Sequence, residues 1–277
     1  MKFNTVKSSR KGSRIINNRM LSGGTVRHLK QPNFKIFVIN LAHSTERWQH
    51  VSQQLDRLHL PYERLDAING KSLTEAEINA VFSTQLADKY FHYRLTRGEI
   101  ACYLSHLKAW QKIVDEGLDF GIILEDDINI SSLFVEVPKR IAAFKAKWDF
   151  IKLAAPFKQQ PYDVIESDTR LHVVSYRRKP PMGACAQAVS FSGARQLLKL
   201  RPPVFRPVDV DLQWSYELGI RTFGLVPYTV DNTHQHSSDI FAVENRHHAR
   251  KSAWRRMKHQ IALYFDNKKT RRKTPRL

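Results

Sequence analysis

Residues Gly121–Ile130 read GIILEDDINI, in which a run of aliphatic residues is followed directly by three acids. The aliphatic residues 122–124 are typical of a strand that is buried in a sheet. Three acids follow at once, Glu125, Asp126 and Asp127, and a buried strand does not accommodate adjacent carboxylates. In open parallel sheets, ligands bind beyond the carboxyl ends of the strands. The stretch therefore predicts a strand that delivers three carboxylates to the ligand edge of a sheet.

The segments before this strand fit such a sheet. Phe34–Leu41 (FKIFVINL) contains a run of β-favouring residues and predicts a strand. Ser44 is a candidate helix cap, and the apolar residues after it recur at helical spacing until Pro61, namely Trp48, Val51, Leu55 and Leu58. Tyr62–Gly70 then predicts a short strand and a turn. The β-α-β order predicts an α/β fold with a Rossmann-type, mostly parallel sheet flanked by helices.

A second helix precedes the acidic strand. Thr96 and Glu99 have the spacing of a capping box, and Gly117 ends the apolar stripe behind them, which comprises Ile100, Tyr103, Leu104, Leu107, Trp110 and Val114. Beyond the acids, the pattern predicts strands at 148–153, 171–176, 185–192 and 221–228, and helices at 194–200 and 207–218.

The positive charge is confined to the two ends of the chain. The 277 residues carry a formal net charge of +19. Residues 1–33 hold eight Lys/Arg and no acid, residues 246–277 hold twelve Lys/Arg and one acid, and residues 34–245 are neutral. A nucleic-acid-binding protein would be expected to carry basic residues across its folded body, so we expect no nucleic-acid partner. The division predicts a flexible basic arm (1–33), a folded domain (34–245) and a basic tail (246–277).

Two further features concern location. Cys102 and Cys185 are the only cysteines, and they lack metal-type spacing. The basic N-terminal segment lacks the apolar stretch of a secretory signal, and no run approaches the length of a spanning helix. These features predict a cytoplasmic protein with two buried thiols.

The acidic triplet has two interpretations. Adjacent carboxylates are tolerated when a divalent cation neutralises them, and Mg²⁺ or Mn²⁺ held in this way completes its shell with water and phosphate oxygens. That chemistry suits a nucleotide diphosphate, whose departure the cation assists. The alternative is an acidic turn that faces solvent.

Five segments in order extend this interpretation: FVINLAHSTERW, LTRGEIACYLSHLKAW, GIILEDDI, FIKL and RPVDVDLQW. Over residues 34–240 the chain resembles glycosyltransferase family 25, the bacterial lipooligosaccharide galactosyltransferases that are related to collagen galactosyltransferases. The resemblance implies a GT-A-like fold, a UDP-sugar donor and inversion at the anomeric carbon. It also implies that Asp127 is the direct metal ligand, with Glu125 and Asp126 directed toward the ribose or the sugar.

Five other residues are candidates for donor binding. Asn40 ends the first strand, where its amide is suited to contact uracil or ribose, although Asn is also an ordinary strand-ending residue. Arg47 lies in the first turn of the next helix, where it is suited to approach the diphosphate, although an exposed arginine is common there. Glu99, Ser105 and His106 lie on the second helix. Ser105 and His106 are off its apolar stripe, and a structural role for His106 is an equal alternative. For Glu99, capping is the favoured role.

The candidate general base lies in Pro207–Leu218. Inverting transfer needs a carboxylate that accepts the proton of the attacking hydroxyl, and Asp209 and Asp211 are the candidates, Asp209 ahead. The alternative is that Asp209 only caps the helix. His234 or His236 is the candidate second metal ligand, with a histidine-rich surface loop as the alternative; His236 is the preferred one.

The basic tail predicts attachment to a membrane. Residues 246–265 are compatible with a helix whose one face is apolar and aromatic and whose other faces are basic, as in helices that bind anionic lipid. We expect an enzyme on the inner face of the inner membrane that transfers galactose from UDP-galactose, in β linkage, to a sugar hydroxyl of lipooligosaccharide or lipopolysaccharide. The alternatives are another UDP-sugar such as UDP-glucose, a phosphohydrolase that uses the triplet, and a nucleic-acid-binding protein.

Overall fold

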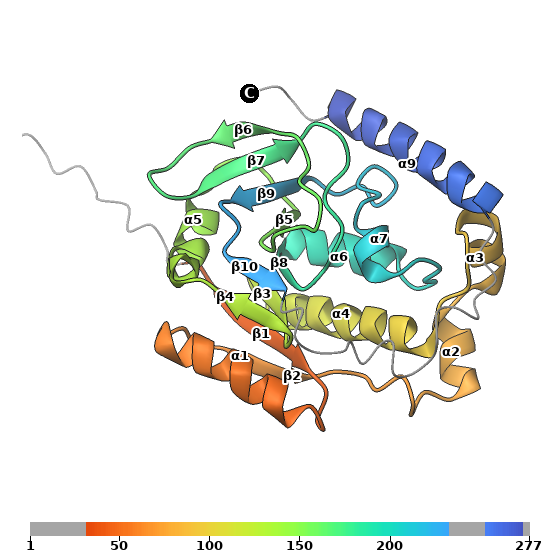
Figure 1. Ribbon diagram of the computed structural model, residues 1–277, viewed down its shortest axis with the longest axis horizontal. Coiled ribbons are helices and arrows are strands. Elements are labelled where there is room, and N and C mark those ends of the chain that lie inside the picture. Colours follow the sequence, from red (N-terminus) through yellow and green to blue (C-terminus); the bar gives the residue numbers. More distant parts are fainter. Residues whose placement is uncertain (1–31, 233–252, 274–277) are drawn as a thin grey trace, which may run out of the picture. The chain divides into compact units, whose positions relative to one another are not determined.

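The computed structural model describes residues 32–232 and 253–273. A central sheet of eight strands runs in the order β2-β1-β3-β8-β5-β9-β7-β6 (Figure 1). Its strands are β1 (Phe34–Asn40), β2 (Glu63–Asp66), β3 (Phe120–Glu125), β5 (Phe150–Lys152), β6 (Tyr162–Glu166), β7 (His172–Tyr176), β8 (Ala186–Ser190) and β9 (Thr222–Val226). The pairings give six of these eight described strands one direction, and β8 and β7 the other. The α/β fold with a mostly parallel sheet is confirmed.

Helices cover both faces of the sheet. On β1, Ile36 and Val38 pack into one apolar cluster, and Phe37 and Ile39, which alternate with them, pack into the other. The first cluster includes residues of α1 (Thr45–Arg57) and α5 (Val137–Ala143). The second includes residues of α4 (Arg97–Asp115), α6 (Phe191–Leu200) and α7 (Val208–Asp211). The β1-α1-β2 unit and the α4 stripe are therefore as predicted.

Several short elements were not predicted. They are α2 (Glu75–Val81), α3 (Thr84–Tyr90), β4 (Ile128–Ile130), the 3-10 turn η1 (Ser132–Glu136), α5, β6 and β10 (Val230–Asn232). The strands β4 and β10 form a separate antiparallel pair, and Ile128 lies opposite Asn232. The predicted helix 207–218 is only the four-residue α7, because the chain turns after Asp211.

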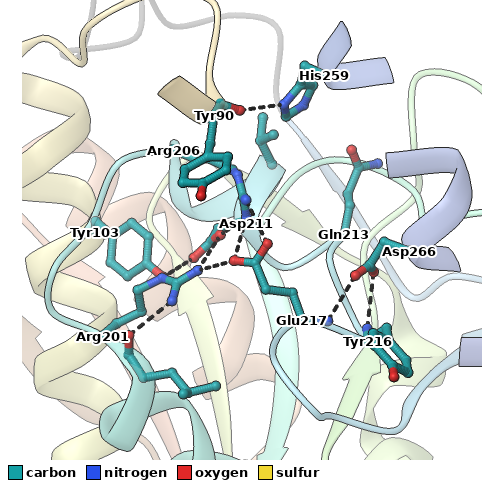
Figure 2. Close-up of polar contacts among 12 residues, drawn as sticks. Tyr90, Tyr103, Arg201, Arg206, Asp211, Gln213, Tyr216, Glu217, His259 and Asp266 are labelled. Carbon is teal, nitrogen blue, oxygen red and sulfur yellow. Dashed lines mark hydrogen bonds and ion pairs between the residues drawn. The ribbon is translucent and has the colours of Figure 1, made fainter. Parts of the chain in front are cut away.

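The basic tail contains α9 (Ala253–Lys273), and this helix packs on the catalytic body near α3 and α7 (Figure 1). Asp266 accepts backbone N–H bonds from Tyr216 (3.1 Å) and Glu217 (2.9 Å), as Figure 2 shows. At the other end, His259 donates from Nδ1 to the Tyr90 carbonyl at 3.4 Å. The polar face of α9 is therefore hydrogen-bonded to the body of the chain. No helix of the described residues is long and apolar enough to cross a membrane.

Candidate functional site

The acidic triplet lies where β1 and β3 end side by side. The two strands are parallel, with Ile39 opposite Glu125. The next residues along each strand meet through their side chains, because Asn40 Nδ2 donates to Asp126 Oδ2 at 2.6 Å. The predicted position of the carboxylates at the carboxyl edge of the sheet is confirmed.

Asp126 is held from the β1 side. Arg47 on the first turn of α1 places Nη1 3.5 Å from Asp126 Oδ1. Asn40 is buried and also accepts a bond from Arg64 Nη2 at 2.5 Å. Burial raises the pKa of Asp126, although Arg47 and Asn40 oppose that rise. Asn40 and Arg47 thus both contact Asp126, so these predicted residues belong to one site. The side chain of Asn40 is already hydrogen-bonded to Asp126 and Arg64, which it holds in place.

Glu125 is held from the α4 side. His106 is fully buried, and its Nε2 lies 3.0 Å from Glu125 Oε1. Gln187 on β8 places its Nε2 2.9 Å from His106 Nδ1. With the amide assigned in this orientation, Gln187 donates to Nδ1 and the neutral imidazole donates from Nε2 to Glu125. His106 is therefore arranged to orient Glu125 in the wall of the cleft that both residues line.

Asp127 lies next to two other carboxylates in a partly buried position. Burial, followed by the charges of Glu125 and Asp126, raises the pKa of Asp127 to about 7. A divalent cation would offset this concentration of negative charge, and carboxylate oxygens are the ligands that Mg²⁺ and Mn²⁺ prefer. Asp127, with Glu125 beside it, therefore fits the predicted cation.

A second donor set fits that cation less well. Cys102, His106 and Glu125 have ligating atoms within 4.8 Å of one another. However, burial, and after it the charges of Glu125 and Asp209, raise the pKa of the Cys102 thiol well above its usual value. A protonated thiol is a poor metal ligand, and thiolates select softer metals than Mg²⁺. The carboxylates remain the better donors.

The predicted histidine ligands His234 and His236 lie outside the described residues. The last described residue before them is Asn232, which pairs with Ile128. Ile128 follows Asp127 directly in the sequence, so Asn232 lies next to the acidic triplet. The segment that contains the two histidines begins immediately after Asn232.

A small cleft of about 120 Å³ adjoins the triplet. Its walls include residues 67–70, Gly98 and Cys102, together with Arg47 and the three acids. Ser105 fixes the first of these segments, since its hydroxyl accepts from Ile68 N (2.9 Å) and donates to the Ala101 carbonyl (2.8 Å). At Gly70 a Cβ would lie 2.9 Å from the backbone of Arg97, so only glycine permits this close approach. Ser105 is thus a positioning residue of the cleft.

Glu99 belongs to the structure of α4. It completes the capping box with Thr96 and also accepts a bond from the Tyr93 hydroxyl at 2.8 Å. Its carboxylate is buried. The favoured capping role is confirmed. The carboxylate of Glu99 is engaged by Thr96 and Tyr93 rather than directed at a sugar donor.

Asp211 is enclosed by cations (Figure 2). Its side chain is 0% exposed and accepts from Tyr103 Oη (2.7 Å), Arg201 Nε (2.7 Å) and Arg206 Nη1 (2.8 Å). Glu217 binds the same two arginines. Burial alone would raise the pKa of Asp211, but Arg201 and Arg206 more than offset this and hold it below its usual range. The catalytic role considered for Asp211 does not fit this geometry, because a buried carboxylate paired with two arginines has no access to a substrate.

Asp209 has a different environment only two residues away. It lies in the first turn of α7, whose cap is Pro207, and its Oδ1 accepts from Val210 N at 2.8 Å. The capping role considered for Asp209 is therefore not observed. Asp209 lines a cavity of about 970 Å³, and its charge acts on Cys102 in the wall of the cleft. The carboxylate thus lines the larger cavity and is near enough to the cleft for its charge to act on Cys102.

Lys152 was missed by the sequence reasoning. It ends β5 and is buried, and its Nζ donates to the carbonyls of Met182 (3.2 Å) and Gly183. Burial lowers its pKa, while Cys185, Asp209 and Glu125 oppose that change. In the sequence, FIKL places a charged residue at the end of an apolar strand. The same pattern identified the acidic triplet, so it could also have identified Lys152.

The sequence is similar to that of a known family of glycosyltransferases. The model of glycosyltransferase family 25 (LPS biosynthesis protein) matches residues 33–212. Procollagen galactosyltransferase 1-A of Xenopus laevis is 28% identical over 193 residues, which cover 66% of this chain and 31% of that protein. Inactive glycosyltransferase 25 family member 3 of Mus musculus is 28% identical over 185 residues, covering 64% and 30%. The chain thus spans about a third of the length of these curated relatives.

Among solved structures, a glycosyltransferase involved in the glycosylation of the major capsid of PBCV-1 is similar. Its sequence identity is 9% and its TM-score 0.39, with 74% of this chain and 95% of that chain covered.

Proposed function

Because the chain belongs to glycosyltransferase family 25, we propose that it is an inverting galactosyltransferase that uses UDP-galactose and Mn²⁺ or Mg²⁺. The family includes relatives described as inactive, so the proposal depends on this chain's own residues. The observation that carries it is a cleft lined by the acidic triplet, with a separate carboxylate, Asp209, whose charge acts on Cys102 in the wall of that cleft.

The cleft is the proposed donor site. Asp127, with Glu125, would hold the cation, and His236 or His234 is the proposed further ligand. When bound, the cation would neutralise the diphosphate charge. Arg47 lines the same cleft and would add a positive charge beside Asp126. His106 and Ser105 support these groups through the contacts described above.

Asp209 is the proposed general base. An acceptor hydroxyl would transfer its proton to the Asp209 carboxylate as its oxygen forms a bond with the anomeric carbon. The bond from that carbon to the diphosphate oxygen breaks, and its electron pair leaves with UDP. Attack on the face opposite the diphosphate inverts the anomeric centre, so an α-linked donor gives a β-linked product.

The donor and the metal can be tested together. UDP-galactose should bind and release UDP in the presence of Mn²⁺, and UDP-glucose and N-acetylated UDP-sugars should be poorer donors. Asp127→Asn should abolish UDP release and Mn²⁺ binding, because it removes the ligand charge. Asp163→Asn, on an exposed ion pair with Arg177, is the matched control. UDP release at the same rate in EDTA would contradict the metal role, and a preferred donor other than UDP-galactose would overturn the galactosyl assignment.

We also propose a lipid-linked acceptor, lipooligosaccharide or lipopolysaccharide, met at the inner face of the inner membrane. Support comes from the face of α9 that points away from the body. Its apolar side chains are 46–62% exposed, and they are Trp254, Met257, Ile261, Tyr264 and Phe265. Lys258, Lys268 and Lys269 are exposed on the same helix. Apolar residues flanked by lysines match an anionic lipid surface.

Vesicle sedimentation tests this attachment. The full chain should bind vesicles that contain anionic lipid more strongly than neutral vesicles, and the binding should weaken as salt rises. Replacing Trp254 and Ile261 together with serine should reduce the bound fraction while leaving the thermal midpoint unchanged, since both side chains face away from the body. Equal binding of the variant and the unmodified chain would contradict a role of this face.

A further inference from the structure

The larger cavity is built from five separate segments. Its walls come from residues 91–93, 156–160 and 179–183, from α7, and from α9 through Arg256, His259 and Gln260. Its volume of about 970 Å³ is in the range of sites that enclose ligands of several rings. One wall is therefore supplied by a helix beyond residue 212, where the match to the family ends.

Asp209 relates this cavity to the reaction. It lines the cavity and acts electrostatically on Cys102, which lines the cleft beside the triplet. A hydroxyl bound in the cavity would therefore be within the same space as the proposed base. An acceptor needs this proximity to the base, so the cavity is the candidate acceptor site.

The charges of the cavity are unbalanced. Lys158, Lys179 and Arg256 come from three different segments, and Asp209 is the one acid among the described lining residues. Over the described parts of the chain, none of these three cations has a carboxylate within ion-pair distance. By contrast, the adjacent Arg255 pairs with Asp88 at 3.2 Å.

Burial affects the charges of Lys179 and His259 in this cavity. Lys179 is half-buried, and this lowers its pKa, so the charged form would gain from a bound anion. His259 does not add to the charge at neutral pH, because burial lowers its pKa to about 4. The other walls are mostly apolar and aromatic, with Phe91, Phe157 and Met182 among them. A ligand that matches these walls combines an uncharged body with an acidic group.

We propose that this cavity is the acceptor site and that it selects an acidic saccharide, one that carries a phosphate or carboxylate group bound by Lys179 and Arg256. The inference rests on the proposed function, since it assigns the acceptor of that transfer. It gives α9 a second role: its outer face carries the exposed apolar residues, and its inner edge supplies Arg256 to the site.

Binding of simple probes tests the cavity without turnover. Calorimetry with the full chain and saturating UDP would compare glucose 6-phosphate, glucuronate and glucose; the UDP prevents the anions from binding at the diphosphate position. At least one acidic probe should bind about tenfold more tightly than glucose. Arg256→Gln and Lys179→Gln should each remove most of that advantage. Arg255→Gln removes the same charge from the same helix but outside the cavity, and should leave it intact.

Two outcomes would overturn the proposal. One is equal binding of glucose and both acidic probes, and the other is an equal loss in Arg255→Gln and Arg256→Gln, which would indicate only the general positive field of the chain. UDP-galactose binding, measured separately, distinguishes the two proposals. Its absence alongside selective, Arg256-dependent binding of an acidic probe would refute the galactosyltransferase and retain an acidic-saccharide site.

Discussion

Asp209→Asn should lower kcat by about 10²- to 10⁴-fold, the usual contribution of a general base, while UDP-galactose binds as before. Asparagine keeps the size of the side chain and an oxygen that can accept from Val210 N, so α7 should retain its turn. It cannot accept a proton from a sugar hydroxyl. Single-turnover kinetics and donor binding on the same preparation would separate the chemical step from affinity.

The pH profile gives a second readout for Asp209. A base must be ionised, so kcat/KM of the unmodified enzyme should fall on the acidic side. Asp209→Asn should lose the part of that fall that Asp209 contributes, while the part due to protonation of Asp127 remains. Asp163→Asn again serves as the control for removal of an exposed aspartate. Unchanged turnover and an unchanged profile in Asp209→Asn would remove Asp209 from the mechanism.

Asp211→Asn should have the opposite signature, a large loss of stability. The change leaves Arg201 and Arg206 buried without their main counter-charge, and breaking a buried pair in this way costs about 3–5 kcal/mol. For a domain of this size the melting temperature should fall by about 10 °C. Tyr103→Phe removes one hydrogen bond to the same carboxylate and should cost about 1 kcal/mol.

The effect of Asp211 should depend on pH in a defined direction. Its folded-state pKa lies below the ordinary value, so the carboxylate stabilises the fold fully above about pH 4. This contribution is lost as the pH falls through the folded-state pKa. Denaturant midpoints of the unmodified chain and Asp211→Asn should therefore converge in acid. A variant as stable as the unmodified chain at pH 7 but without turnover would instead return Asp211 to the catalytic candidates.

The sequence located the candidate site because charged residues ended apolar strands. Asn40 and the acidic triplet each follow a run of buried residues, and parallel pairing brings such strand ends together. The same rule would have found Lys152, which received no role. The capping role of Glu99 was also predictable, since its partner Thr96 is only three residues away.

Contacts between distant residues were not predictable in this way. Asp209 and Asp211 are similar as sequence, and only the folded chain brings Tyr103, 108 residues away, to one of them. Likewise, the spacing of Trp254, Met257 and Ile261 predicted an apolar face on α9. It did not predict that this face stays exposed while His259 and Asp266 dock the helix.

The mostly parallel sheet flanked by helices, the edge that carries the carboxylates and the uneven distribution of charge were thus predictable from the sequence. These features follow from the spacing of apolar and charged residues and from the order of the predicted elements, both of which can be read from the sequence. Only the tertiary structure decided which aspartate is neutralised by arginines and which faces a cavity, and which side of α9 forms the wall of that cavity. The physical reason is that burial and ion pairing depend on groups that the fold brings together from separate parts of the chain.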